Sequence, residues 1–280
     1  MNDNSYIHFP GLFFHQSMAF YGGKALFFAP TEDGLNCNIY DFDTRSFDSH
    51  LVLPILGDYV PHANAACFSD VYLNSNSMFP ALYVSAWDGD RCAYIYDIYQ
   101  ADENIDARLV QMIDPSQVSD SILGLGYLNW VVDAKNRRLY SIAYRLRFSD
   151  LVIKDNAIHL TCFKLPDINS EKVVVLKDSD ILDNKVFPVI NAFQDSFFDS
   201  ERIFMVSGYS ASENFFANKL HIINVENWSV SEYDILIQGE PEGLSEYKGN
   251  KFIFIPFADG ETGRVYYLNK IIRNNSDNSI

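Results

Sequence analysis

Short apolar runs alternate with polar turns along almost the whole chain. Within several of these segments every second residue is apolar, which is typical of half-buried β-strands. Helical periodicity is nearly absent, and its strongest trace, DSDILD from Asp178, predicts no more than a single turn. The pattern therefore predicts an all-β protein.

Two distant stretches repeat one pattern, HQSMAFYGGKALFFAP from His15 and EPEGLSEYKGNKFIFIPF from Glu240. Each has a polar head, an apolar stretch, a Tyr followed shortly by Gly, and a second β-rich run. Three further stretches fit the pattern more loosely. The polar residues that anchor the five copies are Gln16, Asn64, Asn129, Gln194 and Glu242. They lie 48, 65, 65 and 48 residues apart, which indicates a repeat architecture with insertions between strands.

Each copy continues into a third apolar strand, at Cys37, Cys92, Ile158, Lys219 and Arg264. Three or four strands per repeat at this period predict a five-bladed β-propeller, with a six-bladed ring as the alternative. The last copy is one strand short, so we expect the segment from Ser5 to Pro10 to close the ring as its outer strand. No Gly-, Ser- or Pro-rich linker divides the chain, which predicts a single domain over 1–280.

The anchor is an amide or a carboxylate in all five copies, although the positions after it are largely apolar. This uniformity predicts a ring of polar side chains at one mouth of the central channel, with a ligand-binding role. The residues expected at this site are His15, Gln16, His62, Asn64, Asn129, Gln194, Glu240 and Glu242. The structural alternative is that these side chains hold water and tie the blades together.

Composition narrows the choice of ligand. The formal net charge is −16, which opposes binding to nucleic acids and to anionic membrane surfaces. No apolar run reaches the ~18 residues of a membrane-spanning helix. The first ten residues contain no secretory signal, so we expect a protein that is either cytoplasmic or exported with its signal removed.

The stretches HQSMAFYG, PHANAA, NWVVD, ALYVS and EPEGLSEYKGNKFIF together resemble a set of bacterial β-propeller proteins, known mainly from gut Bacteroidales, that have no established activity. More distantly, the chain is similar to gluconolactonase-like (SMP-30) and NHL/YncE-like propellers, in which a PEG stretch opens a blade. That resemblance implies a divalent cation such as Ca²⁺ or Mg²⁺ at the channel mouth. Glu242, Asn64 and Asn129 are the residues that would hold the cation.

Two functions remain open. The first is a propeller that binds a small polar ligand, a glycan or a protein segment at the channel mouth, and the lack of a catalytic motif favours it. The alternative is a metal-dependent hydrolase, lactonase-like or glycosidase-like, in which a cation polarises a carbonyl and a histidine acts as the base. Arabinanase-like glycosidases need three central carboxylates, and the sequence offers only Glu240 and Glu242, both on one blade.

Overall fold

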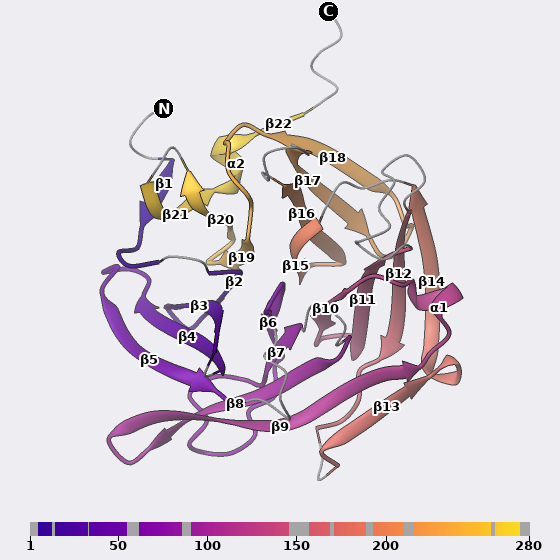
Figure 1. The fold of residues 1–280 in the computed structure, drawn as a ribbon, viewed down its shortest axis with the longest axis horizontal. Coiled ribbons are helices and arrows are strands. Elements are labelled where there is room, and N and C mark those ends of the chain that lie inside the picture. The colour runs from indigo at the N-terminus through magenta and orange to yellow at the C-terminus, as the bar shows by residue number, and fades with distance from the viewer. Residues whose placement is uncertain are drawn as a thin grey trace, which may run out of the picture.

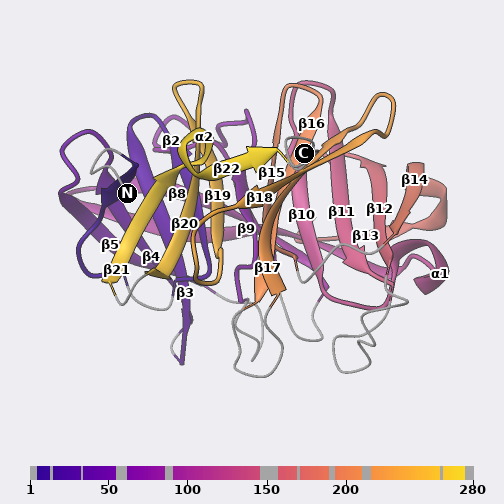
Figure 2. The same cartoon turned by 90° about the horizontal axis from the view of Figure 1, so that it is seen from above.

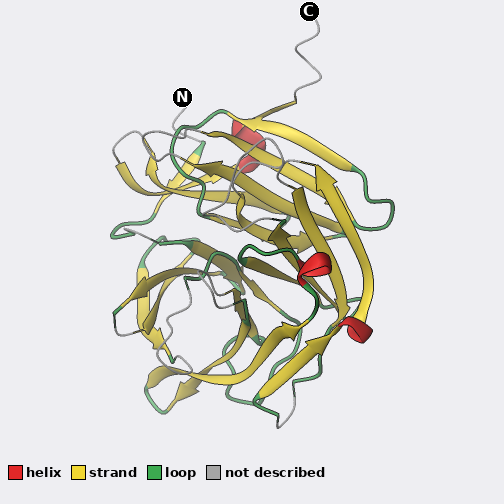
Figure 3. Ribbon diagram, turned by 45° about the vertical axis from the view of Figure 1, so that its right-hand side comes forward, coloured by secondary structure: helices red, strands yellow, loops and turns green. Residues whose placement is uncertain are grey.

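The strands form five small sheets arranged in a ring around a central channel (Figure 1), so the chain is a five-bladed β-propeller. Figure 2 shows the ring from the side, and Figure 3 shows that strands dominate it while the helices are short. The computed structural model describes residues 5–12, 15–32, 34–54, 62–85, 91–145, 157–168, 171–188, 193–209, 216–258 and 261–274.

Each blade begins at the channel and continues outward. From the channel outward, blade I consists of β2 (Ser17–Tyr21), β3 (Lys24–Thr31), β4 (Gly34–Asp41) and β5 (Phe47–Leu53). Blade II consists of β6 (Ala66–Phe68), β7 (Leu82–Ser85), β8 (Ala93–Ala101), β9 (Asn104–Gln117) and β13 (Val173–Lys177). Blade III consists of β10 (Leu128–Asp133), β11 (Arg138–Tyr144), β12 (Ala157–Lys164) and β14 (Ile181–Pro188).

The two remaining blades close the ring. Blade IV consists of β15 (Phe193–Asp199), β16 (Arg202–Tyr209), β17 (Phe216–Asn224), β18 (Val230–Ile235) and β22 (Ile272–Asn274). Blade V consists of β19 (Gly243–Tyr247), β20 (Asn250–Ala258), β21 (Glu261–Tyr267) and β1 (Tyr6–His8). Two short helices, α1 (Asp120–Leu123) and α2 (Leu268–Ile271), connect strands. Among the residues described here, no helix is long and apolar enough to cross a membrane.

The Tyr–Gly signal of the two best-matched repeats marks a tight hairpin. Gly22 and Gly23 join β2 to β3, and Lys248 and Gly249 join β19 to β20, all four with positive φ. Two-residue turns of this kind match the twist of antiparallel strands and favour glycine. The repeated motif therefore specifies the first turn of each of these blades.

The N-terminal strand completes blade V, which confirms the predicted closure. Strand β1 pairs antiparallel with β21 through Tyr6 and Tyr266, and the backbone N–H of Phe9 donates a hydrogen bond to the carbonyl oxygen of Gly263, 2.8 Å away. Gly263 has a φ of +70°, and a Cβ there would lie 2.0 Å from the carbonyl oxygen of Phe9. Only glycine allows this close approach of the two chain ends.

Two outer strands cross from one blade to its neighbour, an arrangement that the sequence analysis did not predict. After β12, the chain adds β13 in parallel to β9 of blade II, passes through a 3₁₀ turn at Asp178–Asp180 and returns to blade III as β14. The last strand, β22, pairs with β18 of blade IV after leaving blade V. Together with β1, these strands tie neighbouring blades at the outer rim.

Apolar side chains fill the spaces between neighbouring blades. Leu26, Phe252 and Leu139 lie equally far along the chain from the anchors Gln16, Glu242 and Asn129, and all three are buried. Leu26 and Phe252 pack against the blade that follows their own, whereas Leu139 packs against blade II, which precedes its own. Because successive side chains of a strand point to opposite faces, the third repeat is shifted by one residue relative to the first and last.

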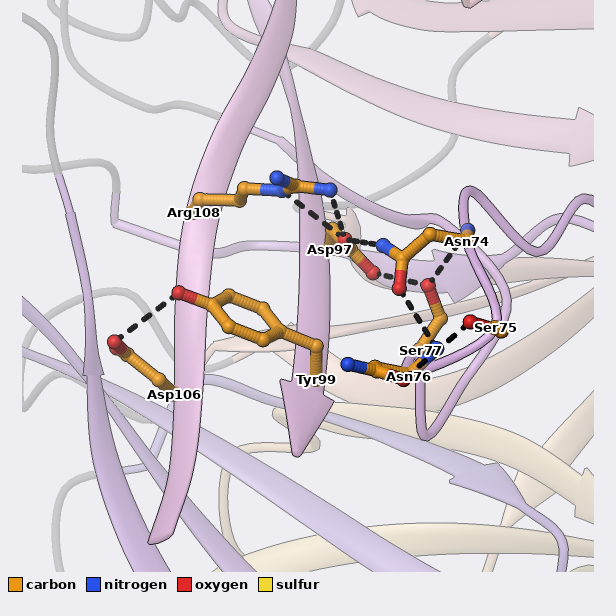
Figure 4. A network of polar contacts seen from close by, with 8 residues as sticks. All are labelled: Asn74, Ser75, Asn76, Ser77, Asp97, Tyr99, Asp106 and Arg108. Carbon is orange, nitrogen blue, oxygen red and sulfur yellow. Dashed lines mark hydrogen bonds and ion pairs between the residues drawn. The ribbon is translucent and has the colours of Figure 1, made fainter. Parts of the chain in front are cut away.

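A buried acidic residue holds the long connection between β6 and β7 against blade II (Figure 4). The carboxylate of Asp97 in β8 accepts hydrogen bonds from Asn74 Nδ2 at 2.8 Å, Ser77 Oγ at 2.7 Å and Arg108 Nη2 at 2.9 Å. Its side chain is almost completely buried, while that of Arg108 is half exposed. All three partners belong to the same blade, so this network stabilises the fold rather than forming a ligand site.

Candidate functional site

The five anchor residues lie where the inner strands begin, at one mouth of the channel. Gln16 and Glu242 directly precede β2 and β19, Asn64 lies two residues before β6, and Asn129 and Gln194 are the second residues of β10 and β15. Asn64, Asn129 and Glu242 are buried, while Gln16 and Gln194 are half-buried. The anchors thus share one end of the inner strands.

Two of the anchors face blade IV from opposite sides. Trp130 and Val132 pack against blade II, so Asn129, which alternates with them, faces blade IV. Leu244 packs in the cluster between blades IV and V. Glu242, two residues earlier, lies on the same side by the alternation of extended backbone. The structure therefore gathers polar residues of blades III and V around the first residues of β15.

Hydrogen bonds connect these residues across three blades. Asn129 Nδ2 donates to the backbone oxygen of Gln194 at 2.6 Å. Gln194 Nε2 in turn donates to Glu240 Oε1 at 2.6 Å and to the carbonyl oxygen of Gly208 at 3.2 Å. The structure thus joins three of the predicted site residues in one continuous chain of contacts.

Asp195, which the sequence analysis missed, lies in the middle of this group. The pairing of β15 with β16 shifts register between Phe193 and Ser196, as in a β-bulge, and bulges redirect side chains. The carboxylate of Asp195 accepts hydrogen bonds from the backbone N–H groups of Leu244 at 2.7 Å and Ser196 at 2.6 Å. Complete burial nevertheless raises its pKa well above the usual value. In the sequence, the only sign that Asp195 belongs to this group was its position directly after the anchor Gln194.

Glu242 has an unusual environment for a carboxylate. The residue is 7% exposed, and its side chain has no hydrogen-bond or ion-pair partner among the described residues. Burial raises its pKa well above the usual value, and the nearby charges of Glu240 and Asp195 raise it further. The Oδ1 atom of Asn129, also buried, likewise has no partner in the described part of the chain. We call Asn129, Gln194, Asp195, Glu240 and Glu242 the blade IV cluster.

The predicted histidines form two local pairs. His15 Nε2 accepts a hydrogen bond from Asn38 Nδ2 at 3.0 Å, and its ring lies edge-on to that of Phe254. His62 Nδ1 donates to Asn64 Oδ1 at 2.6 Å. The side-chain oxygen of Asn64, one of the three predicted cation ligands, is therefore already engaged by a histidine.

The other two predicted cation ligands, Glu242 and Asn129, both belong to the blade IV cluster, and each retains a side-chain oxygen without a partner among the described residues. Oxygen ligands of this kind suit Ca²⁺ or Mg²⁺. Within the described ranges, no group of three or more His, Cys, Asp and Glu side chains is arranged to hold a metal ion. A cation at this mouth stays a prediction.

The opposite end of the channel contains a cavity of about 210 Å³ that the sequence analysis did not predict. Residues from the inner strands of all five blades line it, including Tyr21, Phe68, Val132, Phe198 and Glu246. These residues follow the anchors along their strands, so the cavity and the blade IV cluster lie toward opposite ends of the channel.

No protein-family model matches the chain and no curated protein matches it in sequence, so the resemblance to Bacteroidales, SMP-30 and NHL/YncE-like propellers stays a prediction. Solved structures with similar folds include Kuenenia stuttgartiensis hydrazine synthase (TM-score 0.49, 12% identity, 91% of this chain and 77% of that chain). Also similar is a chain of the nidogen/laminin complex, with a TM-score of 0.43 and 12% identity over 92% of this chain and 82% of that chain. The β-propeller domain of the trilobed protease from Pyrococcus furiosus has a TM-score of 0.35 and 8% identity over 95% of this chain and 72% of that chain. Similarity at this level carries no information about ligand or activity.

Proposed function

We propose that this propeller binds a small polar ligand, a glycan or a protein segment at the channel mouth where the inner strands begin. The observation that carries the proposal is Glu242, a residue that is 7% exposed and whose carboxylate has no partner among the described residues. A largely buried carboxylate of this kind favours a ligand that donates a hydrogen bond to it.

The surroundings of Glu242 favour a ligand that donates hydrogen bonds or carries positive charge. Glu240 and Asp195 lie close enough to raise the pKa of Glu242, and Asn129 Oδ1 adds another acceptor without a partner in the described ranges. Ammonium groups, sugar hydroxyls and divalent cations share the required chemistry. The net charge of −16 also attracts cations toward the protein.

A thermal-shift screen tests the proposal, because a ligand that binds only the folded state raises the melting temperature. The panel contains Ca²⁺, Mg²⁺, a primary amine, a short peptide amide with a free amino terminus, and neutral mono- and disaccharides. At least one class should raise the melting temperature of the wild-type protein, and Glu242→Gln should abolish that shift. Glu246→Gln is the matched control, since Glu246 lies beside the opposite cavity on β19, the strand that Glu242 directly precedes. No shift with any class, or a shift that Glu242→Gln leaves unchanged, would overturn the proposal.

The hydrolase alternative requires a metal ion or a pair of carboxylates that flank a substrate. Glu240 and Glu242 lie on one blade, two residues apart, and Glu240 is engaged by Gln194. No observation on the described residues favours this alternative over binding.

A further inference from the structure

A second cavity lies apart from the channel, beside α1 and β12, which pack against each other. Figure 1 shows α1 on the outer flank of blade III. Its volume is about 510 Å³, within the range of about 300–1,000 Å³ that is typical of small-molecule sites. The described residues that line it are Asp120, Ser121, Leu125, Arg145, His159 and Val186. None of them belongs to the blade IV cluster.

The imidazole of His159 is held in a defined orientation at this cavity. Its Nδ1 donates a hydrogen bond to the carbonyl oxygen of Ile122 at 2.8 Å, and Asn184 Nδ2 donates to the same oxygen at 3.0 Å. A carbonyl can only accept, so Nδ1 carries the proton and Nε2 is the remaining ring nitrogen. Nε2 has no partner among the described residues. The ring therefore presents one free polar atom from a wall of the cavity.

Among the described residues of the lining, the one charge without an ion-pair partner is positive, although the chain as a whole is strongly acidic. Arg145 is exposed, and its guanidinium has no hydrogen-bond or ion-pair partner in the described part of the chain. The one acidic side chain in the described lining, Asp120, is paired with Arg91 at 2.8 Å. A free guanidinium binds carboxylates well, because its planar fork matches their two oxygens.

An apolar surface adjoins the charged groups. Leu125 and Val186 line the same cavity and are 38% and 54% exposed. Val186 lies directly opposite His159 in the β12–β14 ladder, so the apolar and polar parts of the lining are neighbours. Burial of exposed apolar groups by a ligand is favourable, at roughly 25 cal/mol per Å².

From this juxtaposition we propose that the cavity binds a small amphipathic carboxylate. The carboxylate pairs with Arg145, and its alkyl portion covers Leu125 and Val186. This site is independent of the channel mouth, because none of its residues contributes to the blade IV cluster.

Isothermal titration calorimetry with three eight-carbon probes tests the proposal: octanoate, octanol and octylamine. The wild-type protein should bind octanoate with one-to-one stoichiometry and should bind octanol and octylamine at least tenfold more weakly. Arg145→Ala should weaken octanoate binding roughly tenfold or more, as expected for the loss of a charge-assisted hydrogen bond. Arg273→Ala is the matched control, since Arg273 is an exposed arginine on β22 of blade IV, and it should bind octanoate like the wild type.

Equal affinity for octanoate and octanol, or octanoate binding that Arg145→Ala leaves unchanged, would overturn the proposal. Absence of one-to-one octanoate binding to the wild-type protein would overturn it as well. Glu242→Gln should bind octanoate with the same affinity as the wild type. The octanoate titrations therefore test this cavity independently of the ligand site proposed at the channel mouth. Circular dichroism of each variant verifies that the propeller is folded.

Discussion

Gln194 and Glu240 join two neighbouring blades through a hydrogen bond of 2.6 Å from the amide Nε2 to the carboxylate Oε1. The bond engages Glu240 but leaves Glu242, two residues later on the same blade, without a partner among the described residues. Two acidic residues in one short sequence thus have different environments, since one links blade V to blade IV and the other has no partner among the described residues.

The raised pKa of Glu242 predicts how stability changes with pH. The folded state binds a proton at Glu242 more tightly than the unfolded state does, so in the pH range above 4.5, its usual pKa, the folded protein carries more protons. The free energy of unfolding therefore falls as the pH rises through that range. Glu242→Gln cannot titrate, so its free energy of unfolding should decrease less between pH 4.5 and 8. Urea titrations at several pH values measure the difference.

Glu246→Gln serves as the control for this pH dependence because Glu246 is only half-buried. The free energy of unfolding of the Glu246→Gln variant should change with pH as that of the wild type does. Equal slopes for the wild type and Glu242→Gln would mean that the carboxylate of Glu242 is solvated in the folded protein.

Phe252 packs between blades V and I, and it should be a major contributor to the stability of the ring closure. Phe252→Ala should lower the free energy of unfolding by about 3–5 kcal/mol through the cavity it leaves. Phe47→Ala is the matched change at an exposed phenylalanine and should cost below about 1 kcal/mol. Denaturant titration of both variants compares the losses, and similar losses would contradict the burial assigned to Phe252.

The close approach of β1 to Gly263 predicts that any side chain added at Gly263 destabilises the protein. Gly263→Ala introduces a Cβ that would lie 2.0 Å from the carbonyl oxygen of Phe9. Gly249→Ala is the control, because Gly249 also has a positive φ but no atom within 4 Å of an added Cβ. Both variants carry backbone strain of about 1–2 kcal/mol, and Gly263→Ala should lose about 1–3 kcal/mol more through the clash. Thermal melts that place the two variants at the same stability would argue against the closure geometry.

The hydrogen bonds of Asp97 predict that the position of the connection between β6 and β7 in blade II depends on this one buried carboxylate. Asp97→Ala removes the acceptor for Asn74, Ser77 and Arg108 and should lower the free energy of unfolding by on the order of 3 kcal/mol. Asp106→Ala removes an exposed acceptor from the adjacent strand and should change it by less than about 1 kcal/mol. Hydrogen exchange should also show faster exchange in the connection between β6 and β7 of Asp97→Ala than of Asp106→Ala. Unchanged exchange there would contradict the anchoring role of Asp97.

The architecture was predictable because its signals are local. Alternating apolar runs, tight turns such as Gly22–Gly23 and the recurrence of the pattern identified the strands, the blades and the N-terminal closure. The crossing strands β13 and β22 were not predictable in this way. Their partners lie on neighbouring blades, and a short apolar run does not specify which sheet edge it joins.

The candidate site was predictable only in part, for two physical reasons. The one-residue shift of the third repeat turns Asn129 toward blade IV, and strand register is set by the pairing partner rather than by the strand itself. The register shift beside Asp195 depends on the pairing of β15 with β16, so the sequence analysis overlooked the most buried carboxylate of the cluster. The anchors identified the starts of the inner strands, and the charged residues near Glu242 emerged only from the structure.

Calorimetric titration of the ligand class that gives the largest thermal shift tests the central claim most directly, on the wild-type protein, Glu242→Gln and Glu246→Gln. A binding site built around Glu242 predicts one-to-one binding to the wild type and to Glu246→Gln, with affinity at least roughly tenfold lower for Glu242→Gln. Equal affinities for all three proteins would contradict the assignment of the site to the blade IV cluster.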